Sequence, residues 1–220
     1  TATLSGDVDV STLTVGNTVA NLVFSGNGSS ITNQFVPVND GTITLGTSGG
    51  TQTFNGDLTA NDVVGTVTLN GTIATSNDAI TFGAVTLGSA TIIDTNATGG
   101  NEGDITIAAI TGGSNNLTLS TGNNVSGNDV TVSGAISGLG NLTLADVGGT
   151  ATFSNNVAAA ALSADNTVAN ITFTGSTNTF SAASTLANDG TLTFGDATSD
   201  SFTFKGGLNT ASVAGTVTLN

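Results

Sequence analysis

The chain has 220 residues, one basic residue (Lys205) and 15 acidic residues, so its formal net charge is −14. It contains no His, Cys, Met, Trp or Tyr, which excludes catalysis by an imidazole base or a thiolate and excludes soft metal sites. A single cation offers almost nothing to hold a phosphate, and the acidic charge opposes binding to nucleic acids and to anionic membranes.

Short alternating segments run through the chain and predict an all-β fold. In each segment Val, Ile, Leu or Phe alternates with Thr or Ser, and 42 residues of the chain are Thr. Alternation places the apolar side chains on one face of a strand and the Thr side chains on the other. Gly, Asn, Asp and Ser separate the segments and favour turns. In chain order, the clearest segments are 42–45, 66–69, 104–107, 116–119, 129–132, 141–144, 191–194 and 216–219.

The even spacing of these short strands predicts a parallel β-helix (β-solenoid). A sandwich core usually contains Trp or Tyr, whereas the only aromatic residues here are ten Phe, which we expect in the core. The chain also lacks the longer crossovers of Greek keys. We expect coils of roughly 20 residues, about 11 in all, stacked at ~4.8 Å into a rod on the order of 50 Å long. Tandem β-sandwich domains are the alternative.

An internal repeat organises the chain. Residues 1–46 match residues 150–195 at an offset of 149, and after one inserted residue the match continues to the last residue. The register holds over seventy residues, of which thirty are identical. We therefore predict one long unit of several coils over 1–149 and the start of a second unit over 150–220, which matches 1–70. The chain begins and ends in mid-pattern, so we expect it to be a segment of a longer tandem array.

The pattern of turns and alternating strands in this sequence resembles that of a known group of proteins. The stretches 113–122 and 137–144, with Gly/Asn turns and Thr-alternating strands, resemble the β-helical repeat regions of bacterial surface proteins. The resemblance is to autotransporter passengers, large surface antigens of rickettsia-like bacteria and filamentous-haemagglutinin-type adhesins. It implies a secreted, extracellular rod or filament on a bacterial surface, used for adhesion, spacing or protection.

We expect two kinds of partner. The ends of an uncapped solenoid invite pairing of strand edges, so further copies of the protein could associate end to end or side by side. The adhesive role that the resemblance implies adds the surface of a host or of a neighbouring cell. The absence of Cys is consistent with export of an unfolded chain. A calcium-ordered surface layer or matrix protein is the alternative function.

The acidic turns are candidates for calcium binding. Ca²⁺ takes several oxygen ligands, which Asp side chains and turn carbonyls can supply. Neither an EF-hand loop nor the Gly-rich nonapeptide of calcium-binding β-rolls is present, so caps and solvated charges are the competing interpretation. We expect no other cofactor. The candidate calcium ligands are Asp7, Asp9, Glu102, Asp104, Asp196 and Asp200.

We do not expect an enzyme. Paired carboxylates could act as acid and base in a glycosidase. A β-helical enzyme that acts on polysaccharides, however, needs aromatic residues to stack on sugars or basic residues to neutralise uronates. Lys205 alone, without Trp or Tyr, supplies neither.

Pairs of Thr separated by one residue suggest a further function. Hydroxyls and methyls in pairs on an outer face resemble the ice-binding faces of β-solenoid antifreeze proteins. The pairs are unevenly spaced along the sequence, which favours the simpler interpretation that Thr is the usual outward residue of a strand. The pairs are Thr12/Thr14, Thr42/Thr44, Thr51/Thr53, Thr66/Thr68, Thr191/Thr193 and Thr216/Thr218.

Overall fold

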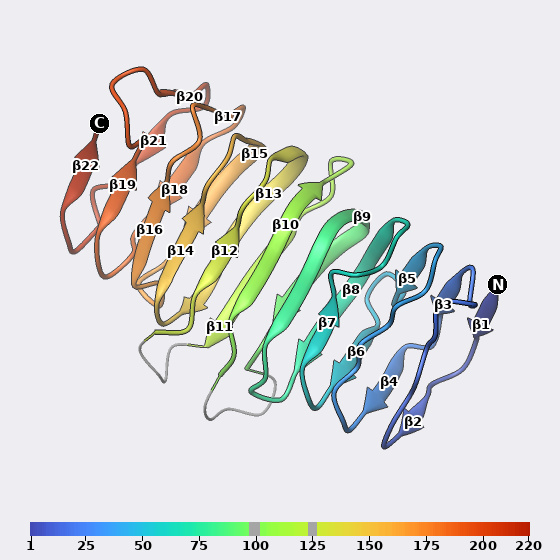
Figure 1. Cartoon of the computed structure of the whole chain (residues 1–220). Coiled ribbons are helices and arrows are strands. Elements are labelled where there is room, and N and C mark those ends of the chain that lie inside the picture. The colour runs from blue at the N-terminus through green and yellow to red at the C-terminus, as the bar shows by residue number, and fades with distance from the viewer. Residues whose placement is uncertain (97–101, 123–126) are drawn as a thin grey trace.

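The computed structural model describes residues 1–96, 102–122 and 127–220, and over these residues it contains strands but no helix. The strands pair in parallel with the strands one turn before and one turn after, and the chain winds through about 10 turns. Figure 1 shows the turns side by side along a rod, with the N-terminus at one end and the C-terminus at the other. The predicted β-solenoid is confirmed, and the sandwich alternative is wrong because its strands would pair antiparallel.

The described residues form 22 strands. They are β1 (Ala2–Leu4), β2 (Asp9–Val10), β3 (Leu22–Phe24), β4 (Gly28–Ile31), β5 (Ile43–Leu45), β6 (Thr51–Phe54), β7 (Leu58–Ala60), β8 (Val67–Thr75), β9 (Ile80–Asp94), β10 (Ile105–Thr111), β11 (Leu117–Gly122), β12 (Val130–Val132), β13 (Ile136–Val147), β14 (Thr150–Phe153), β15 (Val157–Ala164), β16 (Asn170–Phe173), β17 (Thr177–Phe180), β18 (Ser184–Leu186), β19 (Leu192–Phe194), β20 (Ser201–Phe204), β21 (Leu208–Asn209) and β22 (Val217–Leu219).

Three columns of stacked strands run along the rod, and from the third turn onward each turn contributes a strand to all three. Column A consists of β1, β3, β5, the start of β8, the middle of β9, the end of β10, the starts of β13 and β15, β17 and β20. Column B consists of β2, β4, β6, the ends of β8 and β9, β11, the ends of β13 and β15, β18 and β21. Column C consists of β7, the starts of β9 and β10, β12, β14, β16, β19 and β22. The long strands therefore bend at corners and serve more than one column.

The turns vary in length more than the sequence suggested. In column A the step between paired residues is 18 from Val67 to Val85 and 26 from Ile110 to Ile136. The turns are on average longer than predicted, so the chain forms about 10 of them, fewer than the 11 expected. The differences arise at the corners, where residues can be added between the strand segments of neighbouring columns.

The interior is filled by apolar side chains from all three columns. The buried hydrophobic residues form one cluster that extends from Val15 to Phe194. All ten Phe residues except Phe202 and Phe204 are fully buried, and these two pack partly buried against the cluster. The alternation of apolar and Thr residues therefore places the Phe side chains in the core, as the sequence predicted.

Candidate functional site

Aspartate side chains link successive turns at the starts of strands. The carboxylate of Asp7 accepts a hydrogen bond from the backbone N–H of Gly28, one turn later, at 2.9 Å. Asp104 accepts from the N–H of Asp129 at 2.8 Å, and Asp129 accepts from the N–H of Thr150 at 2.7 Å. An ionised acceptor makes such a bond stronger than a neutral one. Two of the candidate calcium ligands, Asp7 and Asp104, thus serve as caps between turns.

The other candidate calcium ligands lie in three separate places: Asp9, Glu102, and the loop that contains both Asp196 and Asp200. Asp9 is exposed in β2. Glu102 is buried, and its carboxylate accepts a hydrogen bond from Nδ2 of Asn128 at 3.0 Å. The structure brings Asp196 and Asp200 together in one loop, where Asp200 accepts from the N–H of Asp196 at 2.9 Å. Within the described ranges, no three or more His, Cys, Asp or Glu side chains gather around one position for a metal ion, and the calcium sites stay a prediction.

Sequence reasoning missed that the caps reach from one turn to the next. The signal was present, because Asp or Asn stands directly before many of the alternating segments, as Asp129 does before β12 and Asn170 at the start of β16. The oxygen of Asn170 accepts from the N–H of Thr191 at 2.9 Å in the second unit. Which N–H such a side chain reaches depends on the length of the turn, which the sequence does not state.

Replacing a capping aspartate tests this role. Asp129→Ala removes the acceptor for the N–H of Thr150, and we expect the free energy of unfolding to fall by about 1 kcal/mol. Asp129→Asn keeps an oxygen in place and is expected to cost less. Urea unfolding followed by circular dichroism measures both, with Asp62→Ala at an exposed position as the matched control. A loss for Asp129→Ala no larger than that for Asp62→Ala would contradict the capping role.

Asp78 is placed where its charge is unfavourable. Burial raises the pKa of Asp78 above its ordinary value of 3.8, and the carboxylate of Asp57 raises it further. A carboxyl whose pKa is raised by folding lowers stability above its folded-state pKa, and this penalty disappears once the pH falls below the unfolded-state value. We expect Asp78→Asn to be more stable than the parent at neutral pH and equal to it in acid. Thermal unfolding at both pH values measures this, and an equal gain at both would contradict it.

An unbroken ladder of threonine runs along the outer side of column C. Each rung pairs with the next rung one turn later, so spacing that is uneven in the sequence becomes even in space. Column A carries a shorter run of Thr44, Thr68, Thr86 and Thr111. The rungs of column C are Thr59, Thr81, Thr106, Thr131, Thr152, Thr172, Thr193 and Thr218.

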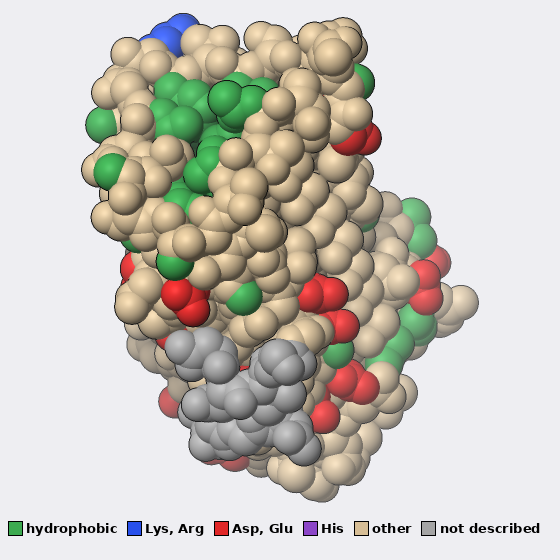
Figure 2. Space-filling model, turned by 90° about the vertical axis from the view of Figure 1, so that its left-hand side faces the viewer, with side chains coloured by type: hydrophobic (Ala, Val, Ile, Leu, Met, Phe, Trp, Pro, Cys, Tyr) green, Lys and Arg blue, Asp and Glu red, His purple; other side chains and the backbone are tan. Residues whose placement is uncertain are grey.

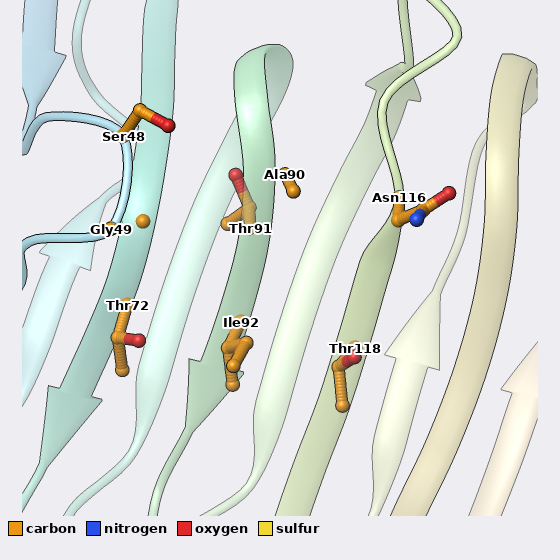
Figure 3. A pocket seen from close by; sticks show the side chains of 9 residues that line it. Ser48, Gly49, Thr72, Ala90, Thr91, Ile92, Asn116 and Thr118 are labelled. Carbon is orange, nitrogen blue, oxygen red and sulfur yellow. The ribbon is translucent and has the colours of Figure 1, made fainter.

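A shallow groove of about 450 Å³ crosses column B. Figure 3 shows its lining side chains, which come from β8, β9, β11, the residue directly before β11 and the loop before β6. Ile92 is 42% exposed here, between Thr72 and Thr118 on the neighbouring turns. None of the nine described residues that line the groove carries a carboxylate or an amine. The groove therefore offers hydroxyl, amide and apolar contacts.

The turn nearest the C-terminus exposes apolar side chains. Figure 2 shows hydrophobic side chains gathered at this end of the rod. Val217 is 39% and Leu219 76% exposed in β22, whereas Leu192 and Phe194 of β19, one turn earlier, are buried. Burial of each turn in this rod thus depends on the turn that follows it.

The chain was compared with protein-family models, with curated proteins and with solved structures, and none of them matches it. Over the described residues, no helix has the length and apolar character of a membrane span. The architecture of the rod and its outer surfaces are therefore the observations from which a function is inferred.

Proposed function

We propose that this protein is a structural rod of a bacterial surface, secreted and extracellular, that serves adhesion, spacing or protection. The observation that carries the proposal is the single apolar core that continues from Val15 to Phe194 through the stacked turns. A fold of this kind gains length by adding turns, and its mechanical role needs no active site. We do not assign it an enzymatic activity.

The outer surface supports this role. Thr ladders and Asp caps occupy outward positions, and the described residues that line the groove beside Ile92 offer hydroxyl, amide and apolar contacts. The resemblance of residues 113–122 to β-helical bacterial surface proteins supports the location. As partners we propose further copies of the protein and the surface of a host or of a neighbouring cell.

Electron microscopy of the purified full chain, with and without a calcium chelator, tests the proposal. We expect rods or filaments whose fibre diffraction has an axial spacing of about 4.8 Å, and we expect them to persist in chelator. Disassembly by the chelator would favour the alternative, a calcium-ordered surface layer or matrix protein, with Asp196 and Asp200 as the first ligands to replace. Compact particles without the axial spacing would contradict both.

One observation favours a second candidate function, ice binding. The ladder from Thr59 to Thr218 presents one hydroxyl and one methyl per turn on a single strip. An ice-binding protein would produce thermal hysteresis, which Thr131→Lys in this ladder would abolish and Thr86→Lys in column A would leave unchanged. The absence of hysteresis in the parent chain would eliminate this candidate.

A further inference from the structure

The two copies of the sequence repeat build the same local structure. In the first copy Leu22 pairs with Ile43, and in the second the equivalent residues Ile171 and Leu192 pair in the same register. The polar links are also reproduced. Asn21 accepts a hydrogen bond from the hydroxyl of Thr42 at 2.9 Å. The equivalent residues Asn170 and Thr191 form the same bond at 2.9 Å.

Equivalent strands nevertheless lie in different columns. β3 and β5 belong to column A, whereas their equivalents β16 and β19 belong to column C. From Leu22 the chain completes six turns of column A before it reaches Val157. It then passes through column B and enters column C at Ile171. The offset of 149 residues therefore corresponds to six and two-thirds turns.

We propose that successive 149-residue units are related by a screw rotation of two-thirds of a turn about the rod axis. Each surface feature of a unit then lies on a different face of the rod from the same feature of the preceding unit. The rise per unit is about 32 Å if each turn adds ~4.8 Å. Three such units make twenty whole turns, so that only the fourth unit would repeat the face of the first. The inference goes beyond the proposed function, because the geometry is the same whether the rod serves adhesion or spacing.

The screw also joins the threonine runs of two units. Thr131 in β12 belongs to column C of the first unit, and its neighbour in the ladder is Thr152 in β14. Thr152 is the sequence equivalent of Thr3, which lies in column A. The two-thirds turn thus places β14, the second-unit equivalent of the column A strand β1, in column C beside β12 of the first unit. The continuous ladder is a product of the fractional number of turns.

The fractional number of turns per unit determines the directions around the rod axis in which equivalent surfaces can bind partners. A whole number of turns per unit would align equivalent surfaces on one side and give a rod with one binding face. A rise of six and two-thirds turns offers the same surface in three directions around the axis. A rod with several units could therefore contact identical partners on different sides, as a spacer or bridge between surfaces requires.

Paired cysteine labels on the full chain test the geometry. The chain has no native Cys, so a small gold cluster can be coupled to engineered thiols alone. Val23→Cys with Thr172→Cys marks two equivalent positions, and we expect electron microscopy to place the labels on different sides of the rod. Val23→Cys with Ala158→Cys is the matched control, since both positions lie in column A, and its labels should lie on the same side. Equivalent labels on the same side would overturn the proposal.

A short thiol crosslinker provides a second measurement. Thr131→Cys with Thr152→Cys should crosslink in high yield, because the two residues are neighbouring rungs of column C. Ser137→Cys with Thr152→Cys, in columns A and C, should not. Circular dichroism confirms that each variant is folded. The proposal fails if the folded first pair stays unlinked or if the second pair links as readily as the first.

Discussion

Replacing Phe173 with alanine is expected to lower the free energy of unfolding by about 3–5 kcal/mol. Phe173 is fully buried in β16, and its ring stacks between Phe153 and Phe194 with centroids 4.9 and 5.7 Å away. The backbone ladders hold the three turns at a set spacing, so the neighbouring side chains cannot close the space that the ring leaves. Urea unfolding followed by circular dichroism measures the loss.

Two variants show whether the cost arises from the stack. Phe173→Leu is expected to lose less than about 1.5 kcal/mol, because most of the volume is kept. The repeat itself makes this exchange, since Leu45 stands where the second unit has Phe194. Phe202→Ala, which removes a partly buried ring near the end of the rod, should cost clearly less than Phe173→Ala. Equal losses at Phe173 and Phe202 would show that the interior stack has no special role.

Replacing Gly71 with alanine is expected to cost about 2–4 kcal/mol, from left-handed backbone strain and overpacking together. Gly71 lies in β8 where the chain turns from column A to column B, and its φ is 65°. A Cβ here would lie 2.3 Å from the carbonyl oxygen of Gly50 and 2.5 Å from that of Thr47. Both obstacles are backbone atoms of the preceding turn, which cannot move without breaking the ladder. Thermal and urea unfolding both measure the effect.

Gly113→Ala distinguishes the cost of a left-handed backbone from the cost of a steric clash of the added Cβ. Gly113 also has a positive φ, of 57°, but the nearest atom to an added Cβ is 3.6 Å away. Its replacement should therefore cost only the left-handed backbone penalty of about 1–2 kcal/mol. If Gly71→Ala and Gly113→Ala prove equally destabilising, the close approach of the turns at Gly71 is not what limits the packing.

The strands and the core were predictable because both depend on local pattern. Segments such as 104–107 and 191–194 alternate with period two, and a strand with that pattern has one apolar face in any arrangement. The parallel stacking followed from the short, evenly spaced strands, the absence of Trp and Tyr and the lack of long crossovers. The number of turns was less well predicted, since corner residues add length without adding a strand.

The candidate surfaces were only partly predictable. The turn positions of Asp7 and Asp104 were evident, but whether their oxygens would face solvent, an ion or a backbone N–H depended on what the next turn placed beside them. Thr pairs such as Thr191/Thr193 were correctly expected to lie outward. Their continuation into ladders along columns A and C was not, because pairing between turns joins residues 18 to 26 positions apart.

By itself, the sequence determined the strands, the inward and outward faces, the acidic character and the existence of a 149-residue repeat. Each of these is a property of neighbouring residues or of a comparison of the sequence with itself. Only the tertiary structure decided that this repeat spans six and two-thirds turns, so that β3 lies in column A and its equivalent β16 in column C. The reason is physical: the face on which a strand lies is set by the summed length of all the turns before it, and each turn closes wherever its backbone finds a partner.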